Sequence, residues 1–319
     1  MRPLSAQFRP YGWALSTDAI ARLAGIPPER VLRFDGNTPH APPPYANAET
    51  VALELSRINT YPHGGFPQLV DAIAAYAGAA PENVVLGAGA DDLIMLVARS
   101  FAGPGDVVAI ADEPTYPLYR VAAWVAGADV GEDDPVLTFC CRPHNPTGAL
   151  VELPAARPLA VDEAYFEYAG GETAAGAIDD GVIVIRTFSK AFGLAGARVG
   201  YALASRDVAA ELNERQAPAP ISSPSAALAL AGLADPPDVT PMLEERDRLA
   251  ARLRELGLEP LRSYANFVYV PLDDAEAMSD ALLREGLAVR GSAEGIRITP
   301  RDRRGDDVLL AALDRLIQV

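Results

Sequence analysis

The stretch RTFSKAFGLAGARVG, residues 186–200, contains Lys190, the only lysine in a chain of 319 residues that also has 26 arginines. Arginine supplies a permanent charge and a planar set of donors, but it keeps its proton and cannot act as an amine nucleophile. A lysine that is partly buried or close to other cations can lose its proton, and its free amine condenses with carbonyls. Alternatively, a GC-rich coding bias could have removed the other lysines and left this one by chance. Lys190 therefore predicts a reactive amine only if its surroundings supply the other groups.

Short apolar runs alternate with helix-period segments on both sides of this stretch. A helical pattern such as DDLIMLVARSFAG (91–103) separates neighbouring runs. Continuous apolar strands separated by helices are typical of a parallel sheet that is buried on both faces. The pattern predicts an α/β fold in which residues 36–234 form a large domain with a mainly parallel sheet flanked by helices. The apolar runs are NVVLGAG (83–89), DVVAIAD (106–112), VLTFC (136–140), PLAVDEAY (158–165), GVIVIRTF (181–188) and GYALAS (200–205).

The C-terminal part of the chain is organised differently and follows a proline-marked break, DPPDVTP. An amphipathic helical pattern comes first, and three strand patterns follow it. Helix and strands grouped in this way predict a smaller α+β domain, to which we assign residues 1–35 and 235–319. The break and the four segments are 235–241, 242–257, 265–271, 287–291 and 295–300.

Composition narrows the class of protein. The formal net charge of −16 argues against nucleic acid or an anionic membrane surface as a partner. No apolar run approaches the ~18–20 residues that a membrane-spanning helix needs, and the N-terminus lacks the basic-then-apolar pattern of a secretory signal. The only cysteines, Cys140 and Cys141, are adjacent, where a disulfide is strained. Two free thiols favour a reducing compartment, so we expect a cytoplasmic protein.

Several polar residues stand where the predicted strands end. In open parallel sheets, ligands bind beyond the carboxyl ends of the strands. Each residue alone has an ordinary structural role, such as a helix cap, a turn or a surface charge. Together they supply an amine, a carboxylate, a phenol, an amide and a donor set suited to phosphate. They are Asn145 after VLTFCC, Asp162 and Tyr165 after PLAV, and Thr187, Ser189, Lys190 and Arg198 after GVIVIR.

The glycine-rich segment GAGADD, residues 87–92, follows the apolar run NVVL. A dinucleotide-binding fingerprint needs a third glycine where Asp92 stands, so NAD binding is a poor interpretation. A glycine turn that opens a helix still leaves backbone N–H groups to hold one phosphate. We favour this anion site over a plain helix cap because the other residues also suit a phosphate.

These motifs resemble those of the class I/II aminotransferases, pyridoxal-phosphate (PLP) enzymes of fold type I. Among them the chain is most similar to the histidinol-phosphate aminotransferases, and the resemblance spans almost the whole chain. It implies PLP as cofactor, fold type I, and a homodimer with shared active sites. The motifs are HNPTG (144–148), DEAY (162–165), TFSKAFGLAGARVGY (187–201) and GAGADD (87–92), with RFDGNTP (33–39), INTYPHGG (58–65), DEPTYPLY (112–119), AVRG (288–291) and GIRIT (295–299).

The resemblance implies a role for each matching residue. Lys190 would bind PLP covalently and then act as general base and acid, and Asp162 would keep the pyridine nitrogen protonated. With these two, Tyr165 completes the catalytic set. Tyr165 and Asn145 would bond the ring oxygen, and Tyr116 would stack on the ring. The cofactor phosphate would be held by the backbone amides of Ala90 and Asp91, by Thr187, Ser189 and Arg198, and by Tyr61 of a neighbouring subunit.

The same resemblance implies the substrates. Arg297, with Arg290, would clamp the anionic group of the substrate, although both lie in strand patterns where an arginine can simply pair on a surface. The amino donor would be histidinol phosphate or an amino acid, and the acceptor a 2-oxo acid. No metal is expected. His40 and His63 lie in Gly/Pro-rich loops, and each either contacts the substrate or has no role in the site.

One segment departs from the family pattern. The family normally has a helix between the asparagine turn and the aspartate strand, whereas only 12 residues, 149–160, separate Gly148 from Val161 here. A parallel crossover needs about a dozen residues. We therefore expect the helix to be lost or reduced to a short connector.

Two other functions would use the same residues. A PLP-dependent decarboxylase of the threonine-phosphate decarboxylase type would break a different bond to Cα, and the choice of bond depends on how the substrate is clamped. A regulator or sensor that binds the cofactor without turnover is the third interpretation. The complete set of Lys190, Asp162 and Tyr165 argues against that third function.

Overall fold

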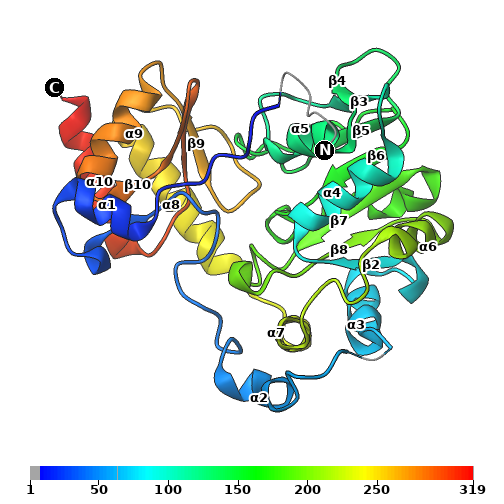
Figure 1. The fold of residues 1–319 in the computed structure, drawn as a ribbon. Helices are drawn as coiled ribbons and strands as arrows, with labels where there is room; N and C mark the ends of the chain where they lie inside the picture. The colour runs from blue at the N-terminus through cyan, green and yellow to red at the C-terminus, as the bar shows by residue number, and fades with distance from the viewer. Residues whose placement is uncertain (1–7, 63, 319) are drawn as a thin grey trace. The chain divides into compact units, whose positions relative to one another are not determined.

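The computed structural model describes residues 8–62 and 64–318 of the chain. Its described part divides into two compact units, and Figure 1 shows the path of the chain through both. The first unit has one sheet and the second has two, and each unit has its own buried core. Among the described residues, the first unit comprises 8–11, 41–144 and 151–237, and the second comprises 12–40, 145–150 and 238–318.

A seven-stranded sheet forms the centre of the first unit. Its strands are β2 Val84–Gly87, β3 Val107–Ile110, β4 Asp129–Val130, β5 Leu137–Cys141, β6 Leu159–Asp162, β7 Val182–Thr187 and β8 Gly200–Leu203. They lie in the order β2-β8-β7-β6-β5-β3-β4. All neighbouring pairs are parallel except the two that β8 makes. The predicted mainly parallel sheet is confirmed.

Six α-helices of the described residues belong to this unit. They are α2 Ala48–Ser56, α3 Pro67–Ala77, α4 Ala90–Phe101, α5 Leu118–Ala126, α6 Arg206–Arg215 and α7 Ser223–Ala234. Helices α3, α4, α5 and α6 pack against the sheet, whereas α2 and α7 pack on each other (Figure 1). Leu93 and Val97, four residues apart on α4, share one face of the helix. They are buried in the same cluster as Phe139 of β5 and Ile185 of β7. Asp91 in the first turn of α4 complements the positive end of the helix dipole.

A buried ion pair joins two strands of the sheet. Arg186 on β7 and Glu163, directly after β6, are 2 % and 1 % exposed, and Arg186 Nε donates to Glu163 Oε2 at 3.0 Å. Side chains alternate along a strand, so this pair points to the face opposite Asp162 and Thr187. The Thr173 hydroxyl donates to the same carboxylate at 2.8 Å. The pair thus fixes the chain where β6 and β7 end.

The connection between β5 and β6 contains no helix, and each of its residues belongs to the described part of the chain. The predicted loss of the family's helix is therefore confirmed. Val107 and Ala109 on β3 are only half-buried, whereas every residue of β5 and β6 is buried. The short connection still leaves both faces of the two strands that carry the predicted site covered.

The second unit is an α+β structure, as predicted. Its strands are β1 Leu32–Arg33, β9 Val268–Pro271, β10 Leu287–Ala288, β11 Arg290–Ser292 and β12 Gly295–Ile298, and its helices are α1 Thr17–Ala24, α8 Thr240–Glu255, α9 Ala275–Arg284 and α10 Arg303–Ile317. Strands β11, β12 and β9 form an antiparallel sheet in that order, and β1 pairs with β10 in parallel. Leu249 and Leu253 of α8, Ile296 of β12 and Leu309 of α10 share its core.

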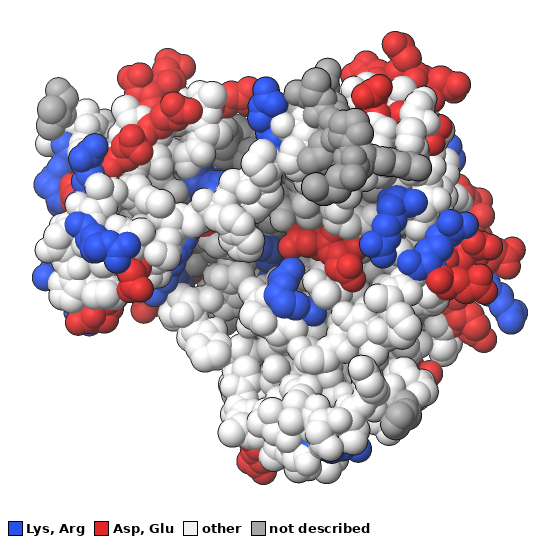
Figure 2. All heavy atoms as spheres, in the orientation of Figure 1, with Lys and Arg blue, Asp and Glu red and all other residues white. Residues whose placement is uncertain are grey.

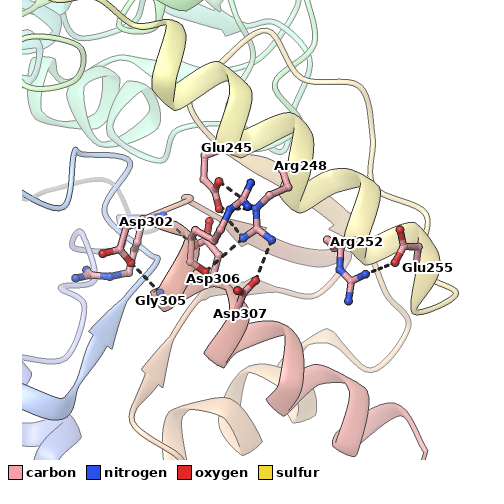
Figure 3. Close-up of polar contacts among 10 residues, drawn as sticks. Glu245, Arg248, Arg252, Glu255, Asp302, Gly305, Asp306 and Asp307 are labelled. Atoms are coloured by element: carbon pink, nitrogen blue, oxygen red, sulfur yellow. Dashed lines mark hydrogen bonds and ion pairs between the residues drawn. The ribbon is translucent and has the colours of Figure 1, made fainter.

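Charged side chains connect α8 to α10 in this unit (Figure 3). Arg248 on α8 donates to Glu245 on the same helix at 2.6 Å and to Asp307 on α10 at 2.9 Å. Asp306 is 0 % exposed and accepts from the backbone N–H of Arg301 at 2.9 Å. Burial raises the pKa of the Asp306 carboxyl, and the nearby Glu245 carboxyl acts in the same direction. The second unit therefore contains a buried acid that favours its protonated form.

The surface carries the acidic side chains that the net charge requires. Figure 2 shows them in dense groups on the face displayed. One exposed group follows β4 and consists of Glu132, Asp133 and Asp134. In the part of the chain that the structure describes, no helix is both long and apolar enough to cross a membrane.

Candidate active site

Asp162 is the last residue of β6 and is 4 % exposed. Its Oδ1 accepts a hydrogen bond from the backbone N–H of Ala164 at 3.0 Å, and its Oδ2 accepts one from the Tyr119 hydroxyl at 2.7 Å. Burial raises the pKa of Asp162 to about 6, while the two hydrogen bonds act in the opposite direction. The carboxylate is thus held in one orientation and is close to its protonation point near neutral pH.

Lys190 lies beyond the end of β7, the parallel neighbour of β6. The register pairs Asp162 with Ile185, so both strands end at the same edge of the sheet. Lys190 Nζ is 5.9 Å from the ring centroid of Tyr165, which is 3 % exposed. The positive charge of Lys190 lowers the pKa of Asp162. The structure therefore brings together the amine, the phenol and the carboxylate that the sequence predicted for this edge.

Strand β8 brings the start of α4 next to the end of β7. Gly200 pairs with Gly87 of β2 on one side and with Thr187 of β7 on the other. A Cβ atom at position 200 would lie 2.8 Å from the Arg186 carbonyl oxygen and 2.8 Å from the Gly89 carbonyl carbon. Only glycine permits this approach of the three backbone segments.

Donor groups suited to a phosphate gather at this junction. Arg198 Nη2 donates to the carboxylate of Asp91 at 3.0 Å. The Thr187 hydroxyl donates to the Ser189 hydroxyl at 2.9 Å, and both residues are buried. The residue before α4 is Gly89, which has no side chain to cap the helix. The backbone N–H groups of Ala90 and Asp91 in the first turn are therefore suited to hold an anion. All five residues predicted for the phosphate site within one subunit are therefore neighbours.

Tyr116 connects two parts of this arrangement. Its hydroxyl donates to Asp91 Oδ1 at 2.9 Å, and its half-buried ring meets the Tyr119 ring edge to face, with centroids 5.7 Å apart. The Tyr11 ring contacts it in the same way at 6.1 Å. Burial raises the pKa of Tyr116 well above its ordinary range, so its phenol stays a donor.

Asn145 and Arg297 meet in the second unit. Arg297 Nη1 donates to Asn145 Oδ1 at 2.5 Å, and Nη2 donates to the Asp35 carbonyl at 2.8 Å. Gly148, with φ +77°, closes the turn of Asn145, and a Cβ there would lie 2.2 Å from the Ser263 hydroxyl oxygen. The glycine of HNPTG is thus required by both its backbone angle and its close packing.

Arg290 is the direct cross-strand partner of Arg297 in the β11–β12 pair. Residues directly opposite each other on antiparallel strands have side chains on the same face. Both arginines are half-buried. The structure therefore places the two predicted substrate ligands next to each other.

Other predicted residues stand apart from these groups. Tyr61 is 84 % exposed on the segment after α2. His63 lies outside the described residues, and His40 is exposed in the second unit. Between residues 8 and 318, position 63 excepted, no three His, Cys, Asp or Glu side chains gather as metal ligands would.

The sequence analysis missed one residue of this site, Tyr119. It is 0 % exposed and bonds the Asp162 carboxylate directly. Its position three residues after Tyr116 in EPTYPLY was a usable signal, because residues three apart share one side of a helical turn.

Comparison with known proteins gives consistent results along the chain. The family model for aminotransferase class I and II matches residues 31–132 and 129–313. A histidinol-phosphate aminotransferase of Thermoanaerobacter sp. (strain X514) is 34 % identical over 305 residues, which cover 83 % of this chain and 86 % of that protein. The histidinol-phosphate aminotransferase of Roseiflexus castenholzii (strain DSM 13941 / HLO8) is 32 % identical over 366 residues and covers 98 % of this chain and 97 % of its own.

A solved structure shows the same similarity in three dimensions. The crystal structure of histidinol-phosphate aminotransferase from Sinorhizobium meliloti in complex with pyridoxal-5'-phosphate has a TM-score of 0.84 and 26 % sequence identity. The match covers 98 % of each chain. Similarity to these proteins therefore includes both units.

Proposed function

Since the chain belongs to the aminotransferase class I and II family, we propose that it moves an amino group from an anionic amine of the histidinol-phosphate type to a 2-oxo acid. It is a PLP-dependent aminotransferase of fold type I. The two relatives compared above by sequence are named as aminotransferases, so we favour amino-group transfer over decarboxylation.

The residues of the first unit fit PLP. When bound, PLP supplies an electron sink that stabilises the carbanion formed at the substrate Cα. Asp162 offers a buried carboxylate of fixed orientation for the ring nitrogen. A Cβ at Gly89 would lie 2.8 Å from Arg198 Nη2, so the glycine keeps this donor site open for a phosphate. Ala90, Asp91, Thr187, Ser189 and Arg198 would hold the phosphate, and Tyr116 would cover the ring.

Lys190 is the proposed proton carrier. Its Nζ would hold the cofactor and, once released by the substrate, would accept the substrate's proton and return it. Tyr165 lies against Lys190 and is almost fully buried, so it restricts where the amine can move. We further propose that Tyr165 and Asn145 bond the ring oxygen of the cofactor and that residues 36–234 act as the PLP-binding domain.

The pair of Arg290 and Arg297 is the observation that supports an anionic substrate. The two arginines occupy directly opposite positions on antiparallel strands, where like charges are unfavourable unless an anion lies near them. Arginine binds carboxylate and phosphate through two parallel hydrogen bonds, and two arginines together suit the double charge of a phosphate. The relatives are named for histidinol phosphate, which carries that group.

We also propose a homodimer, supported by the surface around α2. Leu53, Leu55, Ile58 and Tyr61 are large, apolar or aromatic, and between 52 % and 84 % exposed. Figure 2 shows mostly uncharged surface around the position of α2 in Figure 1. A second copy of the chain would cover this surface and bring its Tyr61 to the cofactor phosphate of the first.

Mixing two inactive variants tests the shared site. Lys190→Ala and Tyr61→Ala proteins, unfolded and refolded together in equal amounts, should regain about a quarter of wild-type activity, because half of the dimers are mixed and each has one intact site. Activity equal to the mean of the two parents would mean that Tyr61 does not act across subunits.

We place the protein in the cytoplasm. Cys140 and Cys141 are both buried and form no disulfide, as expected in a reducing compartment.

A half-reaction screen tests the substrate proposal. The PLP-loaded protein is mixed with histidinol phosphate, histidinol, aromatic amino acids and threonine phosphate, and the loss of the cofactor's absorbance is followed. Histidinol phosphate should react at least about tenfold faster than histidinol if the arginine pair binds its phosphate. A keto product with pyridoxamine phosphate confirms transfer, and release of CO₂ shows decarboxylation. Absence of any reaction would favour the sensor interpretation.

A further inference from the structure

Asp162 is bonded by a tyrosine that lies outside the proposed set of cofactor and substrate ligands. Tyr119, in the first turn of α5, is 0 % exposed, and its hydroxyl donates to Asp162 Oδ2 at 2.7 Å. The Tyr119 ring stacks on Phe139 of β5, with centroids 5.2 Å apart and planes 11° apart. The helix that carries Tyr119 and the strand that supports its ring therefore fix the position of the hydroxyl.

The bond can only run from the phenol to the carboxylate. Burial raises the pKa of Tyr119 well above its ordinary value, so the phenol keeps its proton. A hydrogen bond donated to a buried carboxylate favours the ionised form, whereas burial alone favours the neutral one. The backbone N–H of Ala164 donates to Oδ1 of Asp162, and the Tyr119 hydroxyl donates to Oδ2.

The other titratable groups near Asp162 come from three elements. Asp91 of α4 raises its pKa, and Lys190 after β7 lowers it. Cys140 and Cys141 of β5 are buried, and burial raises the pKa of the Cys140 thiol to about 12. Tyr119 is therefore the neutral side chain whose hydrogen bond most directly opposes the effect of burial.

The segment just before α5 reaches the other end of the proposed cofactor site. Tyr116 contacts the Tyr119 ring and donates to Asp91, which in turn accepts from Arg198. The four residues from Tyr116 to Tyr119, at the start of α5, thus connect the carboxylate predicted for the ring nitrogen with the donors predicted for the phosphate. A shift of Tyr119 would disturb Asp162 first, because that contact is direct.

We propose that Tyr119 is a positioning residue of the active site, which orients the Asp162 carboxylate and keeps it ionised for the ring nitrogen of PLP. This inference rests on the proposed role of Asp162. Tyr119 acts through that carboxylate.

The test is the pH dependence of PLP binding by the full-length protein, measured as a dissociation constant between pH 5 and pH 8.5. Wild-type affinity should fall as the pH drops through about 6, where Asp162 takes up a proton. Tyr119→Phe removes only the hydroxyl, so it should move this fall to higher pH and weaken binding about tenfold at pH 7. The control Tyr45→Phe removes a hydroxyl that donates to the Phe192 carbonyl at 2.7 Å, and it should keep the wild-type curve. A Tyr119→Phe curve with an unchanged midpoint would overturn the proposal, even if binding weakened equally at every pH.

A second variant tests the opposite direction and keeps the hydroxyl, so it also serves if Tyr119→Phe fails to fold. Replacement of Tyr119 by 3,5-difluorotyrosine gives a more acidic phenol and a stronger donor, so the midpoint should move to lower pH. A midpoint that stays or rises contradicts the proposal. If the wild type binds no PLP at any pH, the proposed function fails instead. The Asp162 carboxyl, followed by ¹³C NMR, must then still be protonated at higher pH in Tyr119→Phe than in the wild type.

Discussion

Arg290 and Arg297 occupy directly opposite positions on the antiparallel strands β11 and β12. Like charges in such positions destabilise a sheet, and an anion bound between them removes the repulsion. Arg297 is further held by Asn145 and by the Asp35 carbonyl, so its guanidinium has a fixed direction. The two positive charges on one face of the sheet, with the Arg297 guanidinium held in place, support the proposed binding of a substrate anion.

Arg290→Ala should raise KM for the anionic donor about tenfold with little change in kcat, because it removes binding that the ground state and the transition state share. Steady-state kinetics with the phosphorylated and unphosphorylated donor measure this. Arg262→Ala, an exposed arginine of the same unit, is the control and should leave KM unchanged. An equal loss with both donors would show that Arg290 does not bind the phosphate.

Lys190→Ala should bind PLP without a covalent bond and show no turnover. Lys190 is the only lysine, so borohydride treatment of the wild type followed by peptide mapping should modify one lysine position, 190. Lys190→Arg keeps the positive charge but has no nucleophilic amine, so it should be equally inactive. Normal turnover by either variant would refute the assignment of the proton carrier.

Gly89→Ala should weaken PLP binding at least about tenfold. The glycine has φ +85°, and a Cβ there would come within 2.8 Å of Arg198 Nη2, so the substitution adds both strain and a clash at the phosphate site. Gly78→Ala is a matched control, because Gly78 has φ +67° and a Cβ added there would have no atom within 4 Å. Both variants should lose about 1 kcal/mol of stability, measured by thermal unfolding. Only Gly89→Ala should lose the cofactor, and equal losses would refute the site.

Asp306→Asn should increase stability at high pH. The pKa of Asp306 is raised in the folded state above the unfolded value of about 3.9, so the folded protein binds the extra proton. The contribution of the Asp306 carboxyl to the free energy of unfolding is therefore most favourable at low pH. It is lost as the pH rises from about 4 to about 7. The variant should gain about 1–2 kcal/mol at pH 8 relative to the wild type and little at pH 4, measured by urea unfolding.

Asp307→Asn provides the comparison for that measurement. Its carboxylate forms an ion pair with Arg248 and is 57 % exposed, so its removal should change stability by less than about 1 kcal/mol at either pH. A pH dependence of Asp306→Asn that matched the wild type would show that Asp306 is ionised in the folded protein.

The sequence alone determined the order of the elements and the chemistry at their ends. Apolar runs predicted the parallel sheet, because a strand buried on both faces is apolar at every position. Lys190, Asp162 and Tyr165 were found because the carboxyl ends of adjacent parallel strands share one edge, which brings residues together whatever the details of packing. The loss of the helix between β5 and β6 followed from the resemblance to the family together with the 12-residue length of the connection.

Only the tertiary structure decided the contacts that depend on register and packing. Tyr119 reaches Asp162 because α5 lies on the face of the sheet to which Asp162 points, and Arg290 faces Arg297 because of the β11–β12 register. Asp306 is buried beside Glu245 because α10 packs against α8. The physical reason is the same in each case. Each of these contacts joins side chains that are far apart in the sequence. The burial that shifts their pKa values exists only once the core has folded.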